Sequence, residues 1–184
     1  MQERKKSFTL IELLIVVAVF SIITEAIVGV FAMVLYSQRK ILEEQEILNQ
    51  ISYAIEYMGR SIRMAKKDDL SIGGVSKDCL SGFKTNYESP SPSEIKFRNY
   101  HNQCQRFYLD GGKIAMETID ENVSTTLYLT SPKLKITSLK FNILGQEQTD
   151  EIQPRVTIFL EVEKGGRKFQ FQTTVSQRDL DVEY

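Results

Sequence analysis

The sequence is poor in the residues that most catalytic and metal sites use. Its 184 residues include one histidine, His101, and two cysteines, Cys79 and Cys104. A closed zinc site usually needs four Cys or His ligands, and these three side chains leave such a site incomplete. No nucleophile elbow, phosphate loop or dinucleotide fingerprint occurs. We therefore expect no enzymatic activity, no cofactor and no metal.

The sequence also lacks an excess of positive charge. Lys and Arg total 23 against 24 Asp and Glu, so the formal net charge is −1. Binding to nucleic acid phosphates depends mainly on clustered positive charge, and we expect no nucleic-acid partner for this chain. The acidic pairs Asp68-Asp69 and Asp120-Glu121 lack the spacing of a calcium-binding EF-hand loop, which favours solvated loop charge.

Charge is almost absent from one long stretch, residues 8–36, in which Glu12 and Glu25 are the only ionisable groups before Tyr36. As a helix rising about 1.5 Å per residue, this stretch exceeds the roughly 30 Å hydrocarbon layer of a bilayer. The positive-inside bias predicts a cytoplasmic N-terminus and an exported C-terminal part. Three basic residues carry that bias: Arg4, Lys5 and Lys6.

No small-residue cleavage site of the secretory type follows the apolar stretch, so ordinary signal cleavage is not expected. A generic uncleaved anchor is one alternative. However, a carboxylate inside a membrane helix costs about 2.5–3.5 kcal/mol at the bilayer centre and less near an interface. A plain anchor has no reason to carry Glu12, and its presence indicates a binding partner.

The run KKSFTLIELLIVVA over residues 5–18 resembles the N-terminal signature of type IV prepilins and pseudopilins. This resemblance implies that a prepilin peptidase cuts between Ser7 and Phe8 and methylates the new amino group of Phe8. It also implies that Glu12 faces the N-terminal amine of a neighbouring subunit, where low dielectric strengthens the pairing. The family strongly prefers Gly before the cut, so Ser7 predicts slower processing.

Two more residues of the apolar stretch have alternative interpretations. Glu25 is either protonated or water-accessible within the span, or it contacts another subunit or the assembly platform. Gly29 stands where many pilins carry a helix-breaking Pro, and Gly weakens a helix interior by about 1 kcal/mol relative to Ala. It predicts either local melting on assembly or a close helix contact.

The helix is expected to continue to about residue 67 with apolar residues on one side. A coiled coil is the alternative, but Glu44 breaks the second seam position, and we favour packing against the chain's own strands. The stripe has a period of 3.5 to 3.6 residues and comprises Ile41, Leu48, Ile51, Ile55, Met58, Ile62 and Ala65.

Short alternating or β-branched runs follow the helix and predict an antiparallel sheet. Asp110-Gly111-Gly112 and Lys164-Gly165-Gly166 supply hairpin turns, since Gly tolerates positive φ. The predicted runs lie near 94–100, 104–109, 113–118, 125–130, 134–144, 155–163 and 167–176.

The predicted fold is α+β, a pilin-like ladle in which one long N-terminal helix packs on the sheet. The expected parts are a removable basic leader (1–7), a transmembrane or filament-core half-helix (8–36), an amphipathic half-helix (37–67), a loop-rich connection (68–93) and the sheet domain (94–184).

The globular part is longer than the minimum for a pilin, and it and the segments 57–63 and 171–178 are similar to those of J-type minor pseudopilins and PilW-like minor pilins. That resemblance implies a subunit of a type IV pilus-like or type II secretion filament, with a role in assembly or initiation near the tip. The implied partners are prepilin peptidase, other pilin or pseudopilin subunits, the inner-membrane assembly platform and membrane lipid. The implied location is the cytoplasmic membrane and then the filament.

Cys79 and Cys104 are expected outside the cytoplasm, where disulfides persist, and their bond would close a loop of about 25 residues. Two reduced thiols are the alternative, because geometry decides whether they meet. For the whole chain, a membrane-tethered binding or adhesin module that never polymerises is the alternative function.

Overall fold

The structure is a computed structural model that describes residues 8–67, 79–81, 85–120, 123–147 and 151–178. The chain forms two compact units, residues 1–46 and 47–184. One helix, α1 (Leu10–Arg63), belongs to both units. The basic leader residues and Ser7 lie outside the described residues, as do the carboxylates of Asp68-Asp69.

The local sequence accounts for both ends of α1. No proline occurs between Leu10 and Arg63, and Thr9 caps the start, since the Glu12 amide lies 3.1 Å from the Thr9 carbonyl oxygen. At the other end, the side chains of Tyr87 and Gln177 donate hydrogen bonds to the carbonyls of Ile62 and Ala65, at 2.8 and 3.1 Å. These bonds satisfy carbonyls that have no partner within the helix.

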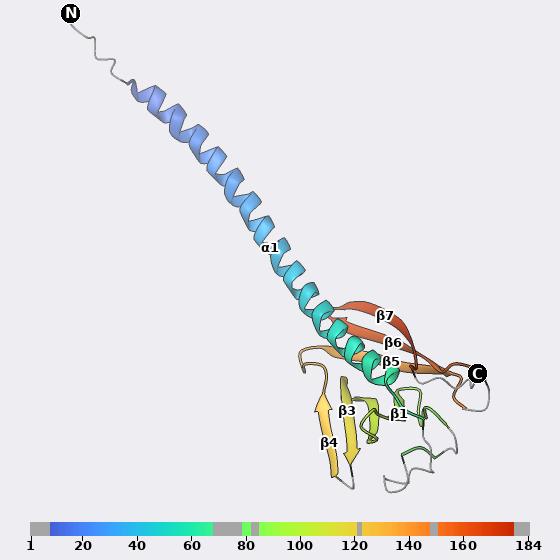
Figure 1. Cartoon of the computed structure of the whole chain (residues 1–184). Helices are drawn as coiled ribbons and strands as arrows, with labels where there is room; N and C mark the ends of the chain where they lie inside the picture. The colour runs from blue at the N-terminus through green and yellow to red at the C-terminus, as the bar shows by residue number, and fades with distance from the viewer. Residues whose placement is uncertain (1–7, 68–78, 82–84, 121–122, 148–150, 179–184) are drawn as a thin grey trace, which may run out of the picture. The chain divides into compact units, whose positions relative to one another are not determined.

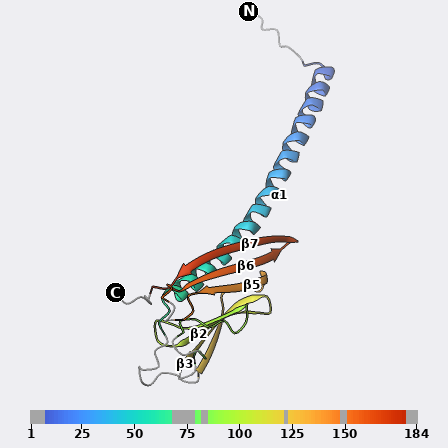
Figure 2. The same cartoon turned by 90° about the vertical axis from the view of Figure 1, so that its right-hand side faces the viewer.

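In the second unit, α1 lies against the strands (Figures 1 and 2) and buries one of its sides. Its buried residues include Ile47, Ile51, Ala54, Met58 and Ile62. The predicted stripe is therefore right for Ile51, Met58, Ile62 and Ala65, while Ile55 is partly buried. It is wrong for Ile41 and Leu48, which are 50% and 46% exposed. The residues that face the strands begin at Ile47 and follow spacings of four and three, so Leu48 lies off the buried side.

The strands form two antiparallel sheets where the sequence predicted one, and the α+β class is confirmed. The first sheet has the order β1-β2-β3-β4 and the second the order β5-β6-β7. The bounds are β1 Glu94–Arg98, β2 Cys104–Asp110, β3 Lys113–Asp120, β4 Val123–Tyr128, β5 Lys135–Leu144, β6 Arg155–Lys164 and β7 Arg167–Ser176.

Both predicted glycine hairpins are present. Asp110 pairs with Lys113 and Lys164 pairs with Arg167, which leaves a two-residue loop in each hairpin. The loop glycines have positive φ, 53° and 78° in the first hairpin and 59° and 75° in the second. Such angles match the right-handed twist of the flanking strands, which explains why these two Gly-Gly pairs set the register.

One core joins the sheets and the helix. The Tyr57 ring lies edge-on to Phe107, with centroids 6.3 Å apart, and Phe107 contacts Phe97 at 5.8 Å. From the second sheet, Ile158 and Val175 belong to the same buried cluster. The two sheets also meet through backbone, because the amide of Phe141 donates to the carbonyl of Pro92 and that of Ile136 donates to Gly112, at 2.9 and 2.8 Å.

Candidate assembly site in the N-terminal helix

The first part of α1 exposes its apolar side chains on all sides. From Phe8 to Tyr36 the large apolar side chains are between 42% and 80% exposed. Residues 10–36 span about 40 Å as a helix, longer than the roughly 30 Å hydrocarbon layer. By length and composition, α1 is able to cross a membrane. Such a surface requires lipid or other helices to cover it.

Glu12 lies in the first turn of α1 and contacts Thr9. The Thr9 hydroxyl lies 3.4 Å from both the Glu12 carboxylate and the Glu12 amide. The Thr9-x-x-Glu12 spacing is that of a capping box, and a negative charge in the first turn favours the helix dipole. Glu12 therefore also has a local role in capping the start of α1, and the spacing Thr9-x-x-Glu12 could have predicted it from the sequence.

The contact between Thr9 and Glu12 leaves the carboxylate accessible. A separation of 3.4 Å is long for a hydrogen bond between oxygens, so the bond is weak. Among the described residues, Glu12 forms no ion pair, and Phe8 is 74% exposed at the start of the described chain. An external cation has room to reach Glu12, whereas the predicted cut between Ser7 and Phe8 falls at the edge of the described residues.

Glu25 lies further along the same apolar part of α1. The hydroxyls of its neighbours Ser21 and Thr24 donate to the helix carbonyls of Val17 and Phe20, at 2.8 and 2.7 Å. Both hydroxyls are thus satisfied within the helix. Glu25, Phe20, Ser21, Thr24 and Val28 line one shallow hollow. The hollow marks a polar interruption of an apolar surface.

Gly29 lies inside the continuous helix, one turn after Glu25. A Cβ built at Gly29 meets no atom within 4 Å. Within the isolated chain, the glycine therefore neither breaks the helix nor accommodates a close neighbour. Its predicted melting on assembly and its predicted close helix contact both require a second chain and stay predictions.

The predicted disulfide between Cys79 and Cys104 is present, with Cα atoms 5.2 Å apart. Both cysteines are buried with Leu80, and Ile119 packs against them. Since Cys104 opens β2, the bond fixes the segment around Cys79 to the first sheet. The His101 ring instead lies against the Tyr100 ring in a tilted arrangement, with centroids 3.7 Å apart. Within the described ranges, no group of three His, Cys, Asp or Glu residues is placed to hold a metal.

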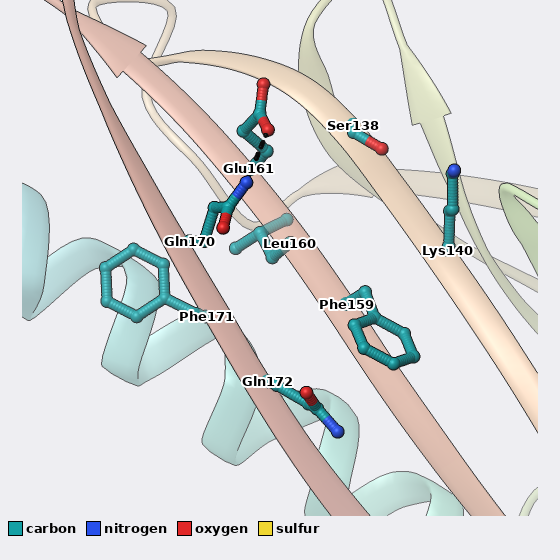
Figure 3. Close-up of a pocket in the computed structure, with 8 residues that line it drawn as sticks. All are labelled: Ser138, Lys140, Phe159, Leu160, Glu161, Gln170, Phe171 and Gln172. Carbon is teal, nitrogen blue, oxygen red and sulfur yellow. Dashed lines mark hydrogen bonds between the residues drawn. The ribbon is translucent and has the colours of Figure 1, made fainter.

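A second hollow lies on the side of the β5-β6-β7 sheet that faces away from α1 (Figure 3). Phe159 is 40% exposed there, opposite Lys140 on β5 and Gln172 on β7. The neighbouring Glu161 accepts hydrogen bonds from Gln170, Thr137 and Lys168, of which the Gln170 bond contributes most to lowering the pKa of its carboxyl. Three side chains of the sheet thus hold the Glu161 carboxylate by hydrogen bonds that favour its ionised form. The hollow is lined by Phe159, Phe171 and Leu160 together with polar side chains, and the Phe159 ring is exposed.

The comparisons with known proteins point to the N-terminus. A family model described as the prokaryotic N-terminal methylation motif matches residues 3–24. No curated protein and no solved structure matches the chain. The matched residues include Phe8, Thr9 and Glu12 and end one residue before Glu25. The second unit, residues 47–184, which contains all the strands and is called the strand-rich unit below, lies wholly outside the match.

Proposed function

Since the chain carries the prepilin-type N-terminal methylation motif of the type IV pilin and pseudopilin superfamily, we propose that it is a minor filament subunit of the pilus or type II secretion kind. The observation that carries the proposal is the apolar part of α1. It begins with the motif, exposes apolar side chains on all sides and holds a carboxylate in its first turn. These are the features of a helix that moves from lipid into a bundle of like helices.

In the proposed sequence of events, the precursor is first a single-pass protein of the cytoplasmic membrane. The basic residues Arg4, Lys5 and Lys6 hold the N-terminus in the cytoplasm, and the unit containing the strands lies outside. A prepilin peptidase hydrolyses the peptide bond between Ser7 and Phe8 and methylates the Phe8 amine. Cleavage removes the leader charge and leaves a cationic amine at the start of the helix.

The carboxylate of Glu12 then pairs with the Phe8 amine of a neighbouring subunit. In a low-dielectric bundle, an unpaired carboxylate is costly and a charge pair is strongly attractive. The weak Thr9 contact holds Glu12 in place without neutralising it, so the carboxylate remains available to an amine. Pairing at a fixed residue sets how far one helix slides along the next.

Glu25 and Gly29 support the same role. We propose that Glu25 contacts another subunit or the assembly platform. The neighbouring hydroxyls of Ser21 and Thr24 donate to helix carbonyls and not to Glu25, and no ion pair of Glu25 occurs among the described residues. Gly29 leaves open space beside the helix for that approach. The resemblance to J-type and PilW-like subunits favours a position just below the tip or in the shaft, since Glu12 is retained.

The experiment that tests processing is the intact mass and N-terminal sequence of the protein from membranes of its native host. We expect a chain that begins at N-methylated Phe8, and a Ser7→Gly variant that is processed faster than the wild type. A wild-type chain that still begins at Met1 in filament-forming cells contradicts the proposal.

Assembly is tested with Glu12→Gln, which keeps the side-chain shape and removes the charge. We expect normal cleavage but at least a tenfold loss from sheared filaments. The matched control is Glu43→Gln, an exposed carboxylate of the same helix beyond the apolar stretch. Equal incorporation of both variants contradicts the role of Glu12.

A membrane-tethered binding or adhesin module is the second candidate. The observation that favours it is the open sheet surface around Phe159, where an exposed aromatic ring lies among Lys140 and Gln172. A chain that keeps Met1 and is unaffected by Glu12→Gln, but loses binding to cells with Phe159→Ala, supports this alternative.

A further inference from the structure

The outer strand of the first sheet, β4, is uncovered. It pairs with β3 alone among the described residues, and all six residues from Val123 to Tyr128 are exposed. A strand whose two faces and one edge meet solvent is unusual, because its unpaired backbone groups are ready to pair with another chain. Proteins usually protect such edges with charge, proline or a covering segment.

The other sheet edges of this chain are protected in that way. Short bridges to Lys66 and Glu88 cover the outer side of β1. On β5, the amides of Ile136 and Phe141 donate hydrogen bonds to the carbonyls of Gly112 and Pro92. The outer strand β7 begins with two cations, Arg167 and Lys168. In contrast, β4 reads VSTTLY and carries neither a charge nor a proline.

The two faces of β4 differ. On one face the Tyr128 hydroxyl donates to Asp110 at 2.7 Å, the Lys113 amine lies over the Tyr128 ring, and the Ser124 hydroxyl donates to Glu117. These contacts complete that face within the sheet. The other face presents Val123, Thr125 and Leu127, because successive side chains alternate across a strand.

This second face continues the apolar side of the core. The register places Leu127 opposite Met116, and Met116 opposite the fully buried Phe107. Yet Leu127 is 51% exposed and Val123 is 66% exposed. The apolar face of the sheet is therefore covered by the core at β2, but it continues onto β4, where it is exposed to solvent.

The order of residues in β4 is self-complementary. Around Thr125 the sequence runs apolar, hydroxyl, hydroxyl, hydroxyl, apolar, from Val123 to Leu127. In an antiparallel pair of two copies centred on Thr125, Val123 of each copy faces Leu127 of the other. Directly opposite residues lie on the same face, so the two apolar patches merge into one without any like-charge contact.

We propose that β4 pairs with β4 of a second copy of this chain, antiparallel and around a two-fold axis at Thr125. Such an isologous contact uses the same patch on both copies and joins two four-stranded sheets into one. A contact built on six-residue strands is smaller than the roughly 1,200 Å² of a stable soluble dimer. Pairing is therefore expected where both copies share a membrane, which raises their effective concentration.

The register is tested by cross-linking the full chain in lipid vesicles. Thr125→Cys brings two cysteines together on the axis, while the native cysteines stay bonded to each other. We expect a covalent dimer with a short bis-maleimide linker. The matched control is Gln172→Cys, an exposed position on β7, which should remain a monomer. Equal cross-linking at both positions overturns the proposal.

A charge exchange separates pairing from misfolding. Thr125→Lys and Thr125→Glu each place like charges opposite each other, and each alone should reduce the dimer at least tenfold in vesicles, as measured by energy transfer between labelled chains. Mixing the two variants should restore it, and Thr125→Val should leave it unchanged. A dimer that survives Thr125→Lys overturns the proposal. So does a mixture that stays monomeric, or a wild-type chain that is monomeric and captures a different protein through β4.

This pairing does not depend on the proposed filament role. It uses residues of the strand-rich unit, whereas processing and assembly use Phe8 and Glu12. A chain that is cut at Phe8 but does not pair through β4 supports the filament role and contradicts the β4 pairing. A chain that is not cut but pairs through β4 contradicts the filament role and supports the β4 pairing.

Discussion

The two parts of α1 are built from the same local structure but differ in what covers them. Residues 10–46 belong to the first unit and none of them is buried, whereas six of residues 47–63 are buried, among them Ile51 and Met58. The backbone is one continuous helix in both parts. Local sequence therefore determines that both parts are helical, whereas the partners that each part meets determine its environment.

The residue pattern states that difference. In residues 47–63, buried residues recur mostly every three or four positions and most of the other residues are polar, so one stripe meets the chain's own strands. In residues 10–36, apolar residues occur on every side, and a helix of that kind needs a surrounding apolar medium. Its partners are therefore lipid and, in the proposed filament, other helices.

The largest expected effect comes from truncating one isoleucine in each part. Ile51 is fully buried and Ile15 is 58% exposed. Ile51→Ala should lower the free energy of unfolding of the strand-rich unit by about 2–5 kcal/mol, because it loses buried contacts and leaves a cavity. Ile15→Ala should leave that free energy unchanged. Urea unfolding of the full chain in detergent, followed by tyrosine circular dichroism, measures both.

If Ile15→Ala destabilises the strand-rich unit as much as Ile51→Ala does, the contrast between the two parts of α1 is wrong. Far-UV circular dichroism provides the control, since both variants should keep the helix. Loss of helix in either variant would mean that α1 is less locally determined than its sequence indicates.

The next effect is confined to the second unit. Replacing Cys79 and Cys104 by alanine opens a loop with a sequence separation of 25. The chain-entropy model gives about 3 kcal/mol of lost stability for a loop of this size. Alanine is chosen in place of serine because both positions are buried, and serine would bury a hydroxyl group there. We expect the same lower urea midpoint for the reduced wild type, with membrane insertion of α1 unaffected. Equal midpoints for the oxidised wild type and the double variant contradict this account.

Much of the fold follows from local sequence patterns. The α+β class, the glycine hairpins and β7 were predictable, because alternation and Gly-Gly pairs act within a few residues. The start of β4 at Val123, two residues before the predicted run, shows where those patterns are weak. In the candidate site, the apolar stretch and the methylation motif were equally visible, since both are contiguous in the sequence.

The remaining features depend on contacts between distant residues. The strands divide into two sheets, and β5 contacts the first sheet through backbone hydrogen bonds to Pro92 and Gly112. These bonds join residues that are distant in the sequence, so no local sequence pattern predicts them. The sequence predicted Leu48 on the buried side of α1, but the structure buries Ile47 instead. The position of the strands determines which side of the helix is covered, and the helix sequence alone does not. The contact between Glu12 and Thr9 follows from the local spacing Thr9-x-x-Glu12, whereas a partner for Glu12 depends on a second chain.

A smaller effect distinguishes the carboxylates of the two units. Glu12 contacts only the Thr9 hydroxyl among the described residues, whereas Glu117 accepts hydrogen bonds from Ser124 and Arg106. The Ser124 bond, followed by the Arg106 contacts, lowers the pKa of Glu117 below its ordinary value of 4.5. A lowered folded-state pKa adds stability above the unfolded-state value, and this stability is lost as the pH falls through the folded-state value.

Glu117→Gln should therefore flatten the fall in the urea midpoint between about pH 7 and about pH 3. Ser124→Ala should flatten it in the same direction but less, because Arg106 still contacts the carboxylate. Midpoints measured across this range test both variants. Parallel curves for the wild type and Glu117→Gln would show that the pairing adds no pH-dependent stability.

The smallest expected effect compares the two glycines of α1. A Cβ at Gly29 meets nothing within 4 Å, whereas a Cβ at Gly59 lies 3.3 Å from the Val175 side chain. Alanine favours a helix over glycine by about 1 kcal/mol, so crowding against β7 opposes that gain at Gly59 alone. We expect Gly59→Ala to destabilise the strand-rich unit by less than about 1 kcal/mol, and to stabilise it once Val175→Ala has removed the crowding methyl group. Gly29→Ala should leave that unit unchanged in either background. A cycle of urea midpoints measures the coupling, and identical effects of Gly59→Ala with and without Val175 would mean that this close approach of helix and strand adds no constraint.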